Sequence, residues 1–176
     1  MVGYIKRFAL IIAVAGFCLQ PAQSGAEQGD CDTPELQQMD FWLGEWDLSW
    51  QATDSMGAGR GHNSITRTLG CVIEENFTGD VSTGNLIGRS LSTFHAPVGK
   101  WRQTWVDNAG GYFALIGGME DERFILTNTR LSERAPHRRM VFEDITSDSI
   151  TWRWQHSEDG EAWSDQWVIN YVRSRP

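Results

Sequence analysis

The sequence lacks the short motifs that mark metal centres and hydrolase nucleophiles. No C-x-x-C, H-x-H or H-E-x-x-H spacing occurs, which excludes the common zinc-binding patterns. The stretch "GRSLS" (88–92) lacks the second glycine of G-x-S-x-G, the turn on which many hydrolases mount their serine. The four histidines are scattered along the chain. We therefore predict no metal site and no cofactor.

No apolar run reaches the length of about 20 residues that a membrane-spanning helix requires. The run Phe8–Leu19 follows the positive pair Lys6 and Arg7 and precedes small residues. This layout is typical of a secretory signal peptide, cleaved after Ala26 or Ser24. The alternative is an N-terminal anchor that is retained. We predict a signal peptide over 1–26, a linker over 27–33 and one domain over 34–176.

Basic residues are fewer than acidic ones. The whole chain has 15 Lys and Arg against 23 Asp and Glu. Loss of Lys6 and Arg7 with the signal peptide leaves 13 of the 15 basic residues and a net charge of −10. Such a surface repels nucleic-acid phosphates and anionic membranes. We expect no nucleic-acid partner and no membrane insertion after cleavage, and the sequence does not indicate an oligomeric state.

Cysteine is scarce, and only Cys31 and Cys71 remain after signal cleavage. In an oxidising compartment two cysteines usually form one disulfide. Closing this loop would add roughly 4 kcal/mol in the chain-entropy model. The alternative is two unpaired thiols, with Cys71 buried in a strand. We predict the disulfide and a secreted, periplasmic location.

Helical spacing is confined to Pro34–Trp42, where Thr33 can cap the helix and Pro34 takes its first position. The rest reads as short strands separated by turns. The expected strands are 46–53, 60–69, 71–78, 85–95, 100–107, 111–118, 122–131, 138–145, 149–157 and 163–173. Their regular spacing predicts an all-β fold, an antiparallel up-and-down barrel of about ten strands with a short N-terminal helix.

Tryptophan is abundant, with nine residues. Many of them differ by four positions, and an even spacing places side chains on one face of a strand. This holds for Trp42, Trp46 and Trp50 (a set that passes from helix to strand at Gly44), for Trp101 and Trp105, and for Trp163 and Trp167.

The stretch Gly44-Glu45-Trp46, after the short helix and at the first strand, resembles the G-x-W signature of the calycin superfamily, which includes lipocalins. In that superfamily the tryptophan packs at the closed end of the barrel beneath an arginine from the last strand. Arg173 in "NYVRS" is the best match, and Arg175 is the second. The resemblance implies a structural role for Gly44, Trp46 and Arg173, with a guanidinium stacked on an indole.

A wider resemblance covers about Asp40 to Arg173. Five blocks are similar, in order, to a family of bacterial calycin-like barrel proteins classed as a domain of unknown function: "DFWLGEWDLSW", "GCVIEENF", "GRSLSTFHAPVGKWRQTWVDNAGGYFALIGG", "SEDGEAW" and "NYVR". The resemblance implies a lipocalin-like barrel and no settled activity. This chain departs from the pattern in "SEDGEAW", which is one glycine short, and in its secretion signal, which many relatives lack.

The candidate site lies inside the barrel, because a barrel of this size either holds one small ligand or is filled by side chains. Alternation gives ligand-binding candidates Trp50, Phe77, Gln103 and Trp105. Glu75 and Asp107 are candidate catalytic residues, an acid/base pair if both face a cavity.

These features lead to three hypotheses. The first is a secreted lipocalin-like barrel that binds a small hydrophobic or aromatic molecule. The second is a small enzyme that uses acid/base chemistry on such a molecule, and the third is an envelope protein that acts through its outer surface. Some calycin relatives bind haem through one histidine, so haem is a further alternative, with Met39 or Met140 as a second ligand.

Overall fold

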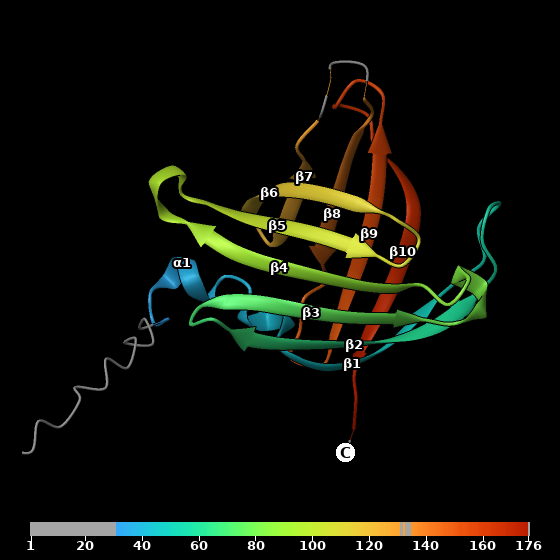
Figure 1. Ribbon diagram of the computed structural model, residues 1–176, viewed down its shortest axis with the longest axis horizontal. Helices are drawn as coiled ribbons and strands as arrows, with labels where there is room; N and C mark the ends of the chain where they lie inside the picture. The colour runs from blue at the N-terminus through green and yellow to red at the C-terminus, as the bar shows by residue number, and fades with distance from the viewer. Residues whose placement is uncertain (1–30, 131, 133–134, 176) are drawn as a thin grey trace, which may run out of the picture.

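Ten antiparallel strands close into a barrel in the computed structural model, which describes residues 31–130, 132 and 135–175 (Figure 1). The predicted signal peptide and residues 27–30 of the linker lie outside this part of the chain. The strands are β1 (Gly44–Trp50), β2 (Gly59–Thr68), β3 (Val72–Gly79), β4 (Ile87–His95), β5 (Lys100–Asp107), β6 (Tyr112–Glu120), β7 (Arg123–Asn128), β8 (His137–Glu143), β9 (Ser149–Ser157) and β10 (Ser164–Arg173).

Each strand pairs with the next one in sequence, and β1 pairs with β10 to close the sheet. The up-and-down barrel predicted from the sequence is therefore confirmed. Alternation sets the interior: Trp46, Leu48 and Trp50 of β1 are buried, and the residues between them are exposed. The same alternation buries Trp101 and Gln103 in β5.

The last strand breaks this alternation at one point. The pairing of β10 with β9 shifts between Asp165 and Trp167, so that one extra residue is inserted. A bulge of this kind turns the side chains on its two sides to opposite faces. Trp163 consequently lies beneath Arg139, whose guanidinium carbon is 4.0 Å from the centroid of the Trp163 ring. Trp167, in contrast, points into the barrel. The expectation that Trp163 and Trp167 share a face is wrong.

The predicted helix is divided in two. Helix α1 covers only Pro34–Gln37, and a 3-10 turn, η1, covers Asp40–Trp42. Thr33 occupies the N-cap position, but its side chain makes no capping hydrogen bond. The helix breaks next to Met39, which is fully buried. The backbone leaves the α-helical conformation at Met39 (φ −103°, ψ 7°), and Met39 and Trp42 are both buried in the barrel.

The helical segment that contains α1 and η1, residues 34–42, closes one end of the barrel, and we call it the plug. Figure 1 shows α1 beside the end at which β4 finishes. The Trp101 indole donates a 3.1 Å hydrogen bond to the Glu35 carbonyl, which ties α1 to β5. Phe41 and Trp42 pack against Phe142, with ring centroids 5.5 and 5.1 Å apart. This end of the barrel is therefore closed by aromatic packing.

Trp46 and Arg173 complete the closure. The Arg173 guanidinium lies 3.7 Å from the centroid of the Trp46 ring and donates hydrogen bonds to the carbonyls of Leu43 and Ser147. Gly44 has a φ of 118°. A Cβ at Gly44 would stand 2.3 Å from Arg173 Nη1, so the arginine can reach its place only across a glycine.

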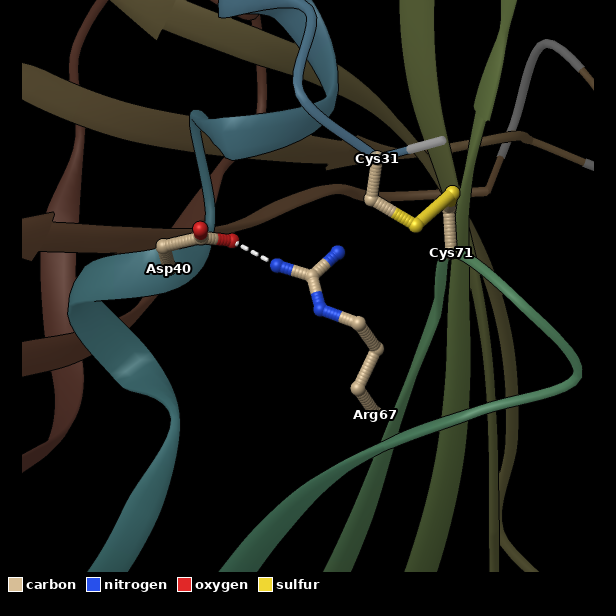
Figure 2. The surroundings of a disulfide bond; sticks show 4 residues. All are labelled: Cys31, Asp40, Arg67 and Cys71. Atoms are coloured by element: carbon tan, nitrogen blue, oxygen red, sulfur yellow. Dashed lines mark hydrogen bonds and ion pairs between the residues drawn. A yellow bond between two sulfur atoms is a disulfide. The ribbon is translucent and has the colours of Figure 1, made fainter. Parts of the chain in front are cut away.

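A disulfide between Cys31 and Cys71 joins the start of the described chain to the β2–β3 turn (Figure 2), which confirms the predicted pairing. Beside it, Arg67 forms an ion pair with Asp40 of η1. Both links hold the N-terminal plug against β2 and β3. Within the described residues, no helix is long and apolar enough to cross a bilayer.

Candidate functional site

A cavity of about 140 Å³ lies inside the barrel and opens to solvent away from the plug. Aliphatic side chains form part of its wall: Leu86, Leu115, Met140 and Ile169. Three polar side chains also line it: Glu75, Asp107 and Tyr171. The remaining wall is aromatic. The barrel is thus neither empty nor completely filled by its own side chains.

Six aromatic side chains surround the cavity, and we call them the aromatic collar: Phe77, Trp105, Phe113, Trp152, Trp154 and Trp167. They form a continuous circuit, since each lies beside the next. Successive ring centroids are 5.0 to 6.4 Å apart from Trp105 through Phe77, Trp167, Trp152 and Trp154 to Phe113. Trp105 and Phe113, at the two ends of this series, are backbone partners on β5 and β6, so the sheet joins the two ends.

The collar lies toward the open end, and two of the polar side chains, Glu75 and Tyr171, lie deeper. All four collar tryptophans are half-buried, whereas Glu75 and Tyr171 are only 5% and 2% exposed. A ligand that enters would pass the indole rings before it reaches these polar groups.

Glu75 is the buried acid of the cavity. Its Oε1 accepts a 2.7 Å hydrogen bond from the Asn63 amide, and its Oε2 accepts a 2.6 Å bond from the Ser90 hydroxyl. Burial raises the pKa of Glu75 to about 7, although these two hydrogen bonds and the charge of Arg89 act in the opposite direction. Glu75 can therefore change its charge near neutral pH.

Tyr171 stands next to this acid. Its hydroxyl accepts a 3.1 Å hydrogen bond from the same Asn63 amide that binds Glu75. Burial and the neighbouring charge of Glu75 raise the pKa of Tyr171 far above its usual range, so the phenol stays neutral. The Asn63 carbonyl oxygen has no hydrogen-bond partner among the described residues, so this buried network retains an unused acceptor.

Asp107 has a different role. Partial burial raises its pKa, but hydrogen bonds from the Trp105 indole and from the amides of Gly111 and Ala109 outweigh burial and lower the pKa overall. The Trp105 bond is 2.9 Å long. Asp107 therefore stays ionised, holds the turn between β5 and β6 and fixes the orientation of Trp105 in the collar.

The structure brings four predicted site residues together on the cavity wall: Glu75, Phe77, Trp105 and Asp107. Trp50 and Gln103 are buried but lie outside this wall. The Trp50 ring lies against Gly59 and Gly61 of β2, and its indole donates a 3.1 Å bond to Ser82. Gln103 donates a 3.0 Å hydrogen bond to the Ser92 hydroxyl. It lies two residues deeper along β5 than Trp105 and does not reach the cavity.

Sequence reasoning missed most of the site. The residues not predicted include Phe113, Trp152, Trp154, Trp167 and Tyr171. Alternation on β9 was the available signal for Trp152 and Trp154, which are two positions apart. For Trp167 and Tyr171, alternation along β10 predicts the inward side chains only if the position of the bulge is known.

The wall does not suit haem. No histidine lies on the wall, and the cavity volume of about 140 Å³ is much smaller than the volume of a tetrapyrrole. His62, for example, binds Glu45 on the exterior of the barrel. Met140 is on the wall, whereas Met39 belongs to the plug. No cluster of three or more metal-ligating side chains occurs within the described residues.

Comparisons with known proteins give a fold and no family. No family model and no curated protein matches the chain. Among solved structures, the crystal structure of Rv2717c from M. tuberculosis is similar to this barrel, with a TM-score of 0.59 and 11% sequence identity. The match covers 81% of this chain and 99% of that one. At this identity the likeness establishes the shared barrel fold alone.

Proposed function

We propose that this protein is a secreted, lipocalin-like barrel that binds one small hydrophobic or aromatic molecule in the cavity. The aromatic collar carries this proposal, because six rings surround a space that is open to solvent. An engineered protein cavity of about 150 Å³ holds benzene. A cavity of about 140 Å³ accordingly suits a compound of about one ring.

The secreted, periplasmic location rests on two features. The N-terminal sequence has the order of charged, apolar and small residues found in signal peptides. The Cys31–Cys71 disulfide fits an oxidising compartment, since disulfides are rare in the reducing cytosol.

A direct test is titration of the mature protein with one-ring aromatic compounds, read by tryptophan fluorescence and calorimetry. We expect saturable binding with a change in emission, because four tryptophans line the cavity. Replacing Trp154 with Ala should weaken binding at least tenfold. Trp163→Ala is the matched control, since this indole lies outside the cavity under Arg139. Absence of saturable binding across the panel would refute the proposal.

A second candidate is an enzyme that acts by acid/base chemistry. It is favoured by one observation: Glu75 and Asp107 both line the cavity, and their surroundings move their pKa values apart. Glu75 would exchange the proton near neutral pH, while Asp107 stays ionised. The test is to replace each acid with its amide, as Glu75→Gln and as Asp107→Asn. If an activity on a bound compound survives both replacements, this mechanism is excluded.

A further inference from the structure

The ionisable side chains on the cavity wall are all acids. They are Glu75, Asp107 and Tyr171, and no lysine, arginine or histidine is among the wall residues. A negatively charged ligand would meet carboxylates with no cation to pair with them. A positively charged ligand would be attracted, both by the wall and by the excess of 23 acidic over 15 basic residues in the chain.

The collar adds a second kind of attraction for a cation. The face of an indole ring is electron-rich and attracts an organic cation, by about 0.5–1 kcal/mol in water and more when both are desolvated. Trp152 and Trp167 cross at 88°, and Phe77 and Trp167 also cross at 88°. Rings that meet at right angles present faces in several directions, which is the arrangement needed to surround a compact ammonium group.

We infer that the ligand of this cavity is a small organic ammonium ion, either methylated or attached to one aromatic ring. The ring faces of the collar would surround the ammonium group, and Glu75 would provide the compensating negative charge. This inference rests on the proposed binding function and narrows its ligand to one chemical class. Cages of aromatic rings are the usual binding site for quaternary ammonium compounds.

Glu75 distinguishes a cation from a neutral ligand. An ionised carboxylate that a neutral aromatic compound covered would lose water and gain no opposite charge, which is costly. Asp107 does not raise this difficulty, because three N–H groups already bind its carboxylate. A ligand that carries positive charge removes the penalty at Glu75 and is therefore preferred over its neutral analogue.

Binding of a cation should also depend on pH. Since the pKa of Glu75 is about 7, the ionised fraction grows about tenfold between pH 6 and pH 8. Asn63 on β2 and Ser90 on β4, which bind Glu75, are neutral, Tyr171 on β10 stays protonated and Asp107 on β5 stays ionised, so these neighbours do not titrate in this interval. Arg89 on β4 is the nearby cation whose charge lowers the pKa of Glu75. Cation affinity should rise up to about tenfold over this range, while the affinity for a neutral ligand should not rise.

The experiment compares choline with 3,3-dimethylbutan-1-ol, in which a carbon replaces the charged nitrogen at nearly identical shape. Phenyltrimethylammonium and benzyl alcohol serve as a second charged and neutral set with a ring. Calorimetry on the mature, disulfide-bonded protein at pH 8 should give at least tenfold tighter binding of a charged member than of its neutral counterpart. In Glu75→Gln this preference and its pH dependence should largely disappear.

The outcomes separate the two proposals. Two results would overturn the cation inference and leave the binding function in place. One is equal or tighter binding of the neutral members, and the other is tighter binding of an anion, benzoate, than of the cations. Failure of every charged and neutral probe to bind would overturn both. Retention of the full preference in Glu75→Gln, with a folded barrel by circular dichroism, would overturn the role assigned to Glu75.

Discussion

Asn63 on β2 donates a 2.7 Å hydrogen bond to Glu75 on β3, and the two side chains are 0% and 5% exposed. The bond joins an amide and an acid on strands that are direct neighbours in the sheet. A carboxyl group kept inside a barrel at this depth destabilises the fold whenever it is ionised. Groups of this kind concentrate at functional sites, which agrees with the position of Glu75 on the cavity wall.

Stability should fall as pH rises through the titration of Glu75. The pKa of Glu75 is raised from 4.5 to about 7 on folding, so the folded state binds the proton more tightly than the unfolded state. The contribution of Glu75 is fully present below about pH 4.5 and is lost by pH 7, which amounts to about 3 kcal/mol. Urea unfolding at pH 4 and pH 8 measures this loss.

Glu75→Gln should remove this loss, because an amide does not titrate. Glu74→Gln is the matched control, since its side chain lies on the opposite face of β3 outside the cavity, and it should keep the wild-type pH profile. A fall in stability of equal size in Glu75→Gln and wild type would assign the effect to another group.

Removal of Arg173 should open the closed end of the barrel. Arg173→Met loses the contact with the Trp46 ring and the hydrogen bonds to the carbonyls of Leu43 and Ser147. We expect a loss of about 2–4 kcal/mol in the free energy of unfolding, and little recovery in Arg173→Lys, because an ammonium cannot stack and bridge two carbonyls together. Arg175→Met is the exposed control and should unfold like wild type. A full recovery with lysine would contradict this account.

The strands could be predicted because their signal is local. Alternation along a strand depends on side-chain direction alone, and it placed Trp101, Gln103 and Trp105 correctly inside the barrel. The short helix was harder, because the backbone leaves the α-helical conformation at Met39 although Met39 and Trp42 keep a helical spacing of three residues. The periodicity of the sequence therefore gives no sign of this break.

The site could be predicted only in part, for a similar reason. Alternation tells which side chains face inward, and it does not tell how far along the barrel they lie or which way they lean. Trp50 faces inward as expected, but its ring leans over Gly59 and Gly61, where no Cβ blocks it. Trp167 reaches the cavity because of one inserted residue in β10.

The disulfide should stabilise the plugged end of the barrel. Cys31 and Cys71 are 40 residues apart, and breaking a loop of that size costs about 4 kcal/mol in the chain-entropy model. The melting temperature should be lower than that of oxidised wild type in two samples. One is the double variant Cys31→Ser, Cys71→Ser, and the other is wild type treated with dithiothreitol. Dithiothreitol should leave the double variant unchanged, which controls for other effects of the reductant. Equal melting temperatures in all samples would show that the bond contributes no stability.

Gly88→Ala should damage the collar through Trp105. A Cβ at Gly88 would stand 2.0 Å from the Trp105 ring, so the indole must move from its place on the cavity wall. Overpacking of this kind costs about 1–3 kcal/mol of stability, and ligand affinity should fall at least fivefold. Gly57→Ala is the matched control, since its added Cβ would make only an ordinary contact, at 3.8 Å from Ser82. Wild-type affinity in Gly88→Ala, measured by calorimetry with phenyltrimethylammonium, would mean that the orientation of Trp105 does not contribute to binding.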